Sequence, residues 1–240
     1  VYEGAVATIN ASENELFKQF MQLVDKYRTM GVRTNADNPK DAQQAIDFGA
    51  EGIGLFRIEH MFYGENSEKP LAILRKMILS GSTEERKKWL NELLPYIKQA
   101  VKGTMQVMNG KPVTFRLIDP PLHEFVPHTQ ENVEALAKEL GIATEELNKR
   151  IVALEEVNPM MGLRGVRLGI TYPEITETQF RALFEAEAEL RKEGFDPHLE
   201  IMVPLTISVT ELKHQKAICD RVHAEVEAAM SAKIEYMYGT

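Results

Sequence analysis

Three arginines stand at similar places in the sequence, and each has the chemistry to bind an anion. Arg57 directly follows an apolar run at 52–56, and Arg116 lies near the end of another run at 112–117. Arg164 lies in a glycine-punctuated segment. A guanidinium group offers a planar fork of N–H donors that matches phosphate and carboxylate oxygens. Together, the three residues predict a site for a small polyanionic ligand.

Structural ion pairs are the alternative explanation for these arginines. Glu59 and Asp119 are acids close in sequence to Arg57 and Arg116. Such a pair would explain a single arginine as well as a ligand does, whereas three arginines in one context favour the ligand. Two prolines directly after Asp119 restrict the backbone there, and this rigidity could hold the end of a strand in place.

Other reactive side chains are better explained by structural roles. His60 and His123 are acid–base or metal candidates by type, but neither shows a ligand spacing such as His-x3-His, which favours structural hydrogen bonding. The single cysteine, Cys219, lies inside an amphipathic helical pattern and is expected to be a small packing residue. No metal-binding cluster and no pair of catalytic carboxylates is visible in the sequence.

The segments that must position these residues alternate between strand and helix. We expect short apolar strands at 5–9, 31–36, 52–56, 112–117, 198–205 and 234–240. We expect helices at 16–27 (with Ser12 as a possible cap), 39–48, 70–79, 83–107, 132–140, 144–155, 176–192 and 209–232, while 160–168 remains open. Capping residues and glycines mark several of these boundaries.

The alternation predicts a parallel α/β fold of the (β/α)8 TIM-barrel type. The strands lack polar alternation, so both faces of each should be covered. No helix opens with a Gly-x-Gly-x-x-Gly or P-loop pattern, which argues against a nucleotide-binding doubly wound sheet. A barrel needs eight strands, and about five precede Thr240, so we expect a barrel truncated after about five strands. Its open edges predict self-association.

Composition narrows the partners and the compartment. The chain has 240 residues and a formal net charge of -8, which argues against nucleic acid and anionic membranes as partners. It has no apolar run of membrane-spanning length, no signal-peptide pattern and one cysteine, so we expect a cytoplasmic protein. The first residue is Val1 instead of methionine, and we expect a piece of a longer protein.

Four segments, in order along nearly the whole chain, resemble the pyruvate, phosphate dikinases. They are GAEGIGLFRIEHMF (49–62), FRLIDPPLHEF (115–125), NPMMGLRGVRLG (158–169) and EIMVPL (200–205). Phosphoenolpyruvate (PEP) synthase and enzyme I of the sugar phosphotransferase system share the same barrel. The DPPLHEF segment favours the dikinases, because the arginine-bearing strand continues differently in the other two families.

The resemblance implies an enzyme that interconverts ATP, phosphate and pyruvate with AMP, pyrophosphate and PEP through a phosphohistidine. Residues 1–10 would be the tail of the swivelling phosphohistidine domain, 11–30 a linker helix, and 31–240 the N-terminal part of the PEP/pyruvate-binding barrel. Arg57, Arg116 and Arg164 would bind the substrate. The parent enzyme would form a homodimer.

The resemblance also implies that part of the site is missing. The Mg2+ ligands and the catalytic cysteine of the family would follow Thr240, so Cys219 cannot take that role. We therefore expect no catalytic residue and no metal ligand in this chain, and no dikinase activity from it alone. The alternative is a stand-alone degenerate barrel that binds a phosphorylated metabolite or a partner without catalysis.

Overall fold

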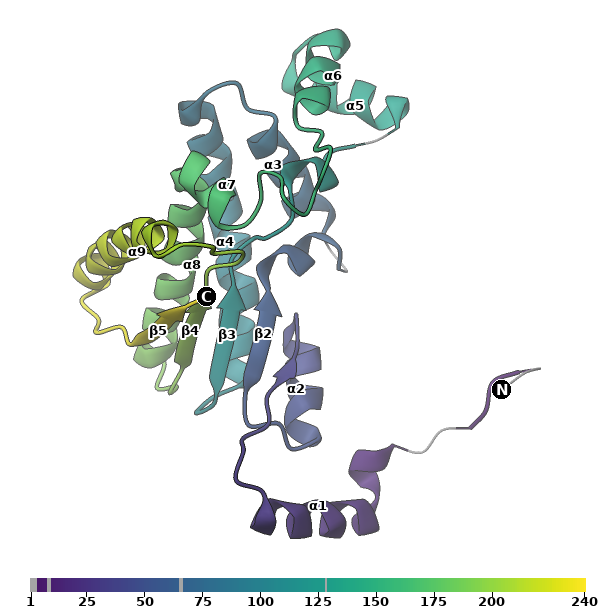
Figure 1. Cartoon of the computed structure of the whole chain (residues 1–240), viewed down its shortest axis with the longest axis vertical. Helices are drawn as coiled ribbons and strands as arrows, with labels where there is room; N and C mark the ends of the chain where they lie inside the picture. Colours follow the sequence, from purple (N-terminus) through teal and green to yellow (C-terminus); the bar gives the residue numbers. More distant parts are fainter. Residues whose placement is uncertain (1–3, 8–9, 65–66, 128) are drawn as a thin grey trace.

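Five strands of the described chain form one parallel sheet whose order follows the sequence (Figure 1). The computed structural model describes residues 4–7, 10–64, 67–127 and 129–240. The sheet order is β1–β2–β3–β4–β5, and every neighbouring pair is parallel. Its strands are β1 Thr34–Asn35, β2 Ile53–Arg57, β3 Pro112–Arg116, β4 His198–Met202 and β5 Tyr236–Gly239. This α/β fold is compatible with the expected truncated (β/α)8 barrel.

Helices connect the strands and cover one face of the sheet. In Figure 1, α4 and α8 lie behind the strands, and α9 lies beside α8. The helices are α1 Glu15–Tyr27, α2 Pro39–Asp47, α3 Glu68–Ile78, α4 Thr83–Val107, α5 Gln130–Leu140, α6 Thr144–Ala153, α7 Val166–Thr171, α8 Pro173–Lys192 and α9 Val209–Met230. Short 3-10 turns form at η1 Ala11–Glu13, η2 Ile58–Phe62 and η3 Leu122–Glu124.

Side-chain caps explain where the long helices begin. The Ser82 hydroxyl accepts a hydrogen bond from the backbone N–H of Glu85 at 3.1 Å, at the start of α4. At the start of α9, Ser208 and Glu211 form the reciprocal capping box that the sequence predicts. Both caps satisfy N–H groups that have no partner inside the helix.

Two sequence-based expectations change in the structure, and the segment left open is assigned. Residues 5–7 of the strand expected at 5–9 are not in a strand, and residues 8 and 9 lie outside the described part. Asn14 takes the capping role expected of Ser12, because its side chain accepts two backbone N–H bonds of the first turn of α1. The segment 160–168, which the sequence left open, is a loop up to Gly165, and its last three residues begin the short α7.

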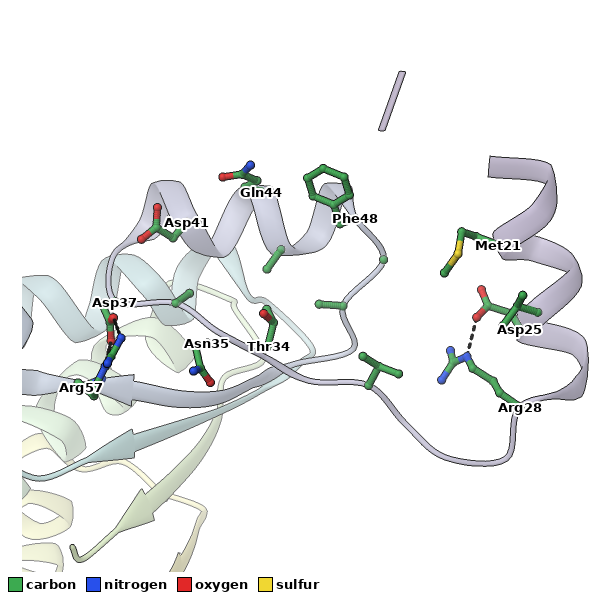
Figure 2. Close-up of a pocket in the computed structure, with 16 residues that line it drawn as sticks. Met21, Asp25, Arg28, Thr34, Asn35, Asp37, Asp41, Gln44, Phe48 and Arg57 are labelled. Atoms are coloured by element: carbon green, nitrogen blue, oxygen red, sulfur yellow. Dashed lines mark hydrogen bonds and ion pairs between the residues drawn. The ribbon is translucent and has the colours of Figure 1, made fainter. Parts of the chain in front are cut away.

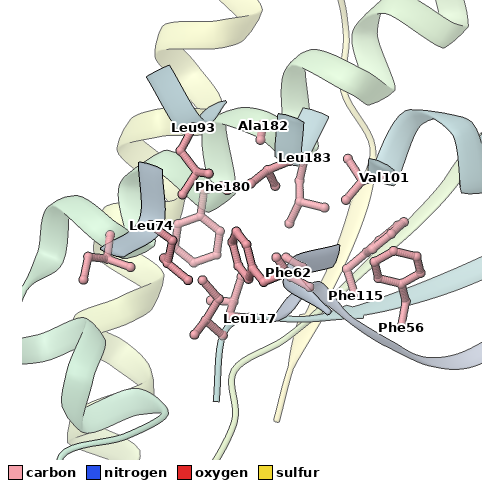
Figure 3. Packing of buried hydrophobic residues seen from close by; sticks show 14 of the residues in the cluster. Phe56, Phe62, Leu74, Leu93, Val101, Phe115, Leu117, Phe180, Ala182 and Leu183 are labelled. Carbon is pink, nitrogen blue, oxygen red and sulfur yellow. The ribbon is translucent and has the colours of Figure 1, made fainter. Parts of the chain in front are cut away.

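The main core lies between the sheet and the helices behind it. Val113, Phe115, Leu199 and Ile201 alternate with half-exposed residues along β3 and β4, and all four are buried. The Phe56 and Phe115 rings pack with centroids 4.9 Å apart. Figure 3 shows this pair together with core residues of α4 and α8, including Val101 and Leu183. The helix-facing side of the sheet is therefore buried and apolar.

The opposite face of the sheet carries polar and half-exposed side chains. The Thr114 hydroxyl donates to Glu200 Oε2 at 2.7 Å, and Arg33 forms an ion pair with the same carboxylate at 2.6 Å. Farther along the sheet, Met237 is 67% exposed. If the sheet closed into a barrel of eight strands, this face would be its interior.

The first helix is peripheral. Among its described side chains none is buried, and Leu16, Phe20, Leu23 and Tyr27 leave an apolar face exposed. The Arg28–Glu51 ion pair ties the end of this segment to the sheet at 2.7 Å. The boundary of a linker helix at 11–30 stays a prediction. In the described residues, no helix is long and apolar enough to cross a membrane.

Candidate functional site

Arg57 and Arg116 lie next to each other at the carboxyl edge of the sheet. Each is the last residue of its strand, and the two are Cα partners in the β2–β3 register. Parallel strands carry their carboxyl ends to the same edge, which explains how residues far apart in sequence meet here. In open and closed parallel sheets alike, this edge is where ligands bind.

Asp37 holds Arg57 in place. The Arg57 guanidinium donates to this carboxylate at 2.5 and 3.2 Å, and the Arg57 backbone N–H donates to it at 2.9 Å. His60 Nδ1 lies 2.9 Å from the same carboxylate, so the histidine has the structural bond expected for it. Burial alone would raise the pKa of Asp37, but the hydrogen bonds from Arg57 and the nearby His60 outweigh burial and lower it.

Arg116 lies between two carboxylates. Its Nη2 donates to Glu59, and its Nη1 lies 3.2 Å from Asp119 Oδ2. Glu59 is 2% exposed, and burial raises its pKa although the Arg116 charge acts in the opposite direction. The acids proposed as structural partners are therefore partners of Arg116, while Arg57 pairs with Asp37 instead.

Arg164 joins the same edge through Asp119. Its Nη2 donates to Asp119 Oδ2 at 2.8 Å, the oxygen that Arg116 also contacts. The following residue, Gly165, has φ +57° and ψ -131°, a conformation that glycine alone adopts readily. A Cβ on Gly165 would lie 2.9 Å from the carbonyl oxygen of Pro204, so the close approach also requires glycine.

Several buried polar atoms at this edge lack a hydrogen-bond partner among the described residues. They are Glu59 Oε2, Arg116 Nε, Asp119 Oδ1, His123 Nδ1 and Arg164 Nε. A buried polar atom without a partner costs roughly 1–3 kcal/mol, so native proteins keep few of them. Four of these atoms belong to the arginine and carboxylate cluster, and this clustering is typical of a binding site.

A cavity of about 710 Å³ lies beside the cluster, but it does not contain it. Figure 2 shows Met21, Asp25 and Arg28 of the α1 segment on one side and residues of α2 on the other. Of the three arginines, only Arg57 lines this cavity. Its walls join a peripheral helix to a sheet edge, so its volume reflects the position of α1 more than the shape of an anion site.

The described residues include no group of three or more His, Cys, Asp or Glu side chains that could hold a metal ion. Cys219 is buried on α9, and burial raises the pKa of its thiol to about 12. A thiol of this kind is unreactive at neutral pH, in agreement with the packing role expected for it.

Asp37 is the site residue that the sequence reasoning missed. It directly follows the strand predicted at 31–36. The rule that singled out Arg57, a polar residue where an apolar strand ends, would also have found it. Arg167 was missed as well, and its Nη1 donates to the carbonyl oxygens of Met161 and Gly162, at 2.5 and 2.8 Å, in the loop that carries Arg164.

Comparison with known proteins places this geometry in a family context. Residues 11–240 match the family described as PEP-utilising enzyme, PEP-binding domain. Pyruvate, phosphate dikinase of Clostridium symbiosum is 45% identical over 241 residues, which cover 100% of this chain and 27% of that protein. The Giardia intestinalis dikinase is 43% identical over 240 residues, with the same two coverages.

A plant relative is similar to the chain over the same extent. The chloroplastic pyruvate, phosphate dikinase 1 of Oryza sativa subsp. japonica is 42% identical over 257 residues, which cover 100% of this chain and 27% of that protein. The chain thus spans about a quarter of the length of these relatives.

Proposed function

The chain belongs to the PEP-utilising enzymes, through their PEP-binding domain, and from this premise we propose that it forms the arginine half of a PEP/pyruvate site. The parent activity that we propose is that of pyruvate, phosphate dikinase: ATP, pyruvate and phosphate are converted to AMP, PEP and diphosphate through a phosphohistidine. The observation that carries the proposal is that Arg116 and Arg164 contact one carboxylate, and that each has a buried Nε with no hydrogen-bond partner among the described residues.

The three arginines would divide the recognition of PEP. PEP carries a phosphoryl group and a carboxylate, and a guanidinium fork can bind either one. Arg57 and Arg116, adjacent in register, would hold the phosphoryl group and the carboxylate region, and Arg164 would add a further donor. Fixed cations at this edge would neutralise charge on the phosphoryl group during its transfer, and correct positioning would supply most of the catalysis.

Mg2+ does not fit the acids present here. Asp37, Glu59 and Asp119 are each engaged by an arginine. Glu59 Oε2 and Asp119 Oδ1 have no hydrogen-bond partner among the described residues, but the guanidinium group beside each carboxylate would repel a cation. We therefore derive no step of the reaction through a metal held by these residues, and we propose that the ligands for Mg2+ are not among them.

The further partners follow from the same proposal. A swivelling phosphohistidine domain would deliver and collect the phosphoryl group, the parent enzyme would be a homodimer, and the compartment would be the cytoplasm. Buried Cys219 is compatible with a reducing compartment.

Calorimetric titration of the full chain with PEP, pyruvate and inorganic phosphate tests the substrate. We expect PEP to bind more tightly than the other two, because it alone presents both anionic groups to the arginines. Equal affinity for PEP and phosphate would mean that the site is a general anion site.

A separate assay tests the proposed inactivity of the chain alone. The chain is mixed with PEP and a phosphorylatable histidine domain, and formation of pyruvate would contradict the proposal.

A further inference from the structure

We propose that Asp119 is a positioning residue that fixes the separation between Arg116 and Arg164 through one shared carboxylate oxygen. The inference deepens the proposed function and rests on it for the identity of the anion. Asp119 would not touch the substrate, because its charge has the same sign. Its effect would be exerted through the two guanidinium groups.

The shared oxygen is the first support. Asp119 Oδ2 lies 3.2 Å from Arg116 Nη1 and 2.8 Å from Arg164 Nη2. Two Nη atoms that contact the same oxygen cannot be farther apart than the sum of these two distances. Without the carboxylate between them, the two guanidinium charges would repel each other. The side chain of Asp119 is 8% exposed, so water screens this arrangement only weakly.

The backbone on both sides of Asp119 is fixed as well. The N–H of Ile118 donates to the buried Gln179 Oε1 on α8 at 2.8 Å. The carbonyl oxygen of Asp119 accepts a hydrogen bond from the N–H of Gly165 at 3.0 Å. Asp119 therefore contacts the Arg164 loop twice, once through its side chain and once through its main chain.

Arg116 is also restrained from its other side. Its Nη2 donates to Glu59, which is almost fully buried. The guanidinium is thus held by a carboxylate at each Nη atom. With Arg116 fixed by two acids, the shared oxygen of Asp119 transmits that fixed position to Arg164. The arrangement prepares two cations for a ligand before it arrives, which lowers the cost of ordering them on binding.

The Arg Nε–H resonances of the full chain, measured by NMR without ligand, test the positioning role directly. Arg116→Lys and Arg164→Lys identify the two signals. Asp119→Asn keeps the size of the side chain but removes its charge, and we expect it to move both signals. The matched control is Glu200→Gln, which removes the partner of Arg33 on the neighbouring strand and should leave both signals unchanged.

PEP titration provides the second readout. We expect Asp119→Asn to weaken PEP binding at least tenfold, and Asp119→Glu, which retains the charge, to recover part of the loss. In wild type, the effects of Arg116→Lys and Arg164→Lys should be non-additive, whereas in Asp119→Asn they should add. Backbone amide spectra of each variant establish that it is folded. If Asp119→Asn does not fold, the Arg Nε–H signals and PEP affinity are measured on Asp119→Glu instead.

The outcomes separate this inference from the proposed function. If Asp119→Asn leaves either arginine signal in place, or leaves PEP affinity at the wild-type value, the positioning role is overturned. If both signals move but the wild-type chain binds no PEP, the positioning role is supported while the proposed substrate is overturned.

Discussion

Arg57 and Arg116 are paired in register at the ends of two neighbouring strands, yet their carboxylate partners come from different parts of the chain. Asp37, which holds Arg57, follows β1, whereas Glu59 and Asp119, which hold Arg116, follow β2 and β3. Residues at or just after the carboxyl ends of three successive strands therefore supply the alternating cations and anions of this edge. Each pairing leads to a measurable consequence.

Replacing Arg116 or Arg57 with lysine should weaken PEP binding by roughly tenfold to a hundredfold, because a lysine keeps the charge but loses the planar fork. Calorimetric titration measures the change. Arg33→Lys alters an arginine that pairs with Glu200 away from the cluster, and its affinity should match wild type. Full affinity in both Arg57→Lys and Arg116→Lys would rule out a binding role for the cluster.

The contribution of Asp37 to stability should disappear in acid. Its pKa is lowered in the folded chain, so its ionised form stabilises the fold above the unfolded pKa of about 3.9. This stabilisation is lost as the pH falls through the lower, folded pKa. We expect the difference in unfolding free energy between wild type and Asp37→Asn to be constant at neutral pH and to shrink below about pH 4.

Arg57→Gln provides the matching control for Asp37. This variant removes the guanidinium hydrogen bonds and charge but keeps the backbone N–H bond to Asp37, so the pKa of the Asp37 carboxyl should rise toward its ordinary value. The acid-dependent loss of stability should then become smaller. Denaturant unfolding at several pH values measures both variants, and an unchanged pH profile in Arg57→Gln would show that another group lowers the Asp37 pKa.

Gly165→Ala should destabilise the chain and weaken anion binding together. The new Cβ would meet Pro204 O at 2.9 Å and Leu205 Cβ at 3.0 Å, and the backbone lies in a region that alanine avoids. Displacement of this residue would carry the adjacent Arg164 with it. Gly141→Ala is the control, because Gly141 also has a positive φ (+69°) but its Cβ would have nothing within 4 Å.

For Gly141→Ala we expect a loss of about 1 kcal/mol in unfolding free energy and no change in PEP affinity. Denaturant unfolding of both variants measures the cost of alanine at a positive φ. PEP titration of both variants shows whether the added Cβ at position 165 displaces Arg164. Similar PEP affinities in the two variants would show that the Arg164 loop does not depend on the close packing at Gly165.

Phe115→Ala should cost about 3–5 kcal/mol of unfolding free energy, because the side chain is fully buried and packs against Phe56. Phe20→Ala removes the same atoms from the α1 face, where the side chain is 61% exposed, and should change stability by about 0.5 kcal/mol or less. Urea unfolding compares them. Equal losses would mean that the α1 face is covered in solution.

The isolated chain should self-associate as its concentration rises. Among the described residues, β1 and β5 are edge strands that pair on one side only, one face of the sheet exposes Met237, and the apolar face of α1 is exposed. Sedimentation velocity over a range of concentrations measures the association. A single monomeric species at every concentration would contradict this expectation.

Local patterns in the sequence predict the α/β architecture and part of the candidate site. A parallel sheet can be predicted from local apolar runs, from helix caps such as Ser82 and Ser208, and from strands that are separated by helical segments, because each depends on residues near one another in the chain. The same logic placed Arg57 and Arg116 at strand ends. It failed for the strand expected at 5–9, where residues 5–7 form no strand, because an apolar run becomes a strand only if it finds a partner.

The pairing of each acid with its arginine depends on the three-dimensional fold. Glu59 lies two residues from Arg57 in sequence, yet it bonds to Arg116 on the neighbouring strand, while Arg57 turns to Asp37. Asp119 bridges to Arg164, 45 positions away. The register between strands and the path of the loops set these pairings, and both depend on contacts across the whole sheet that no local pattern encodes.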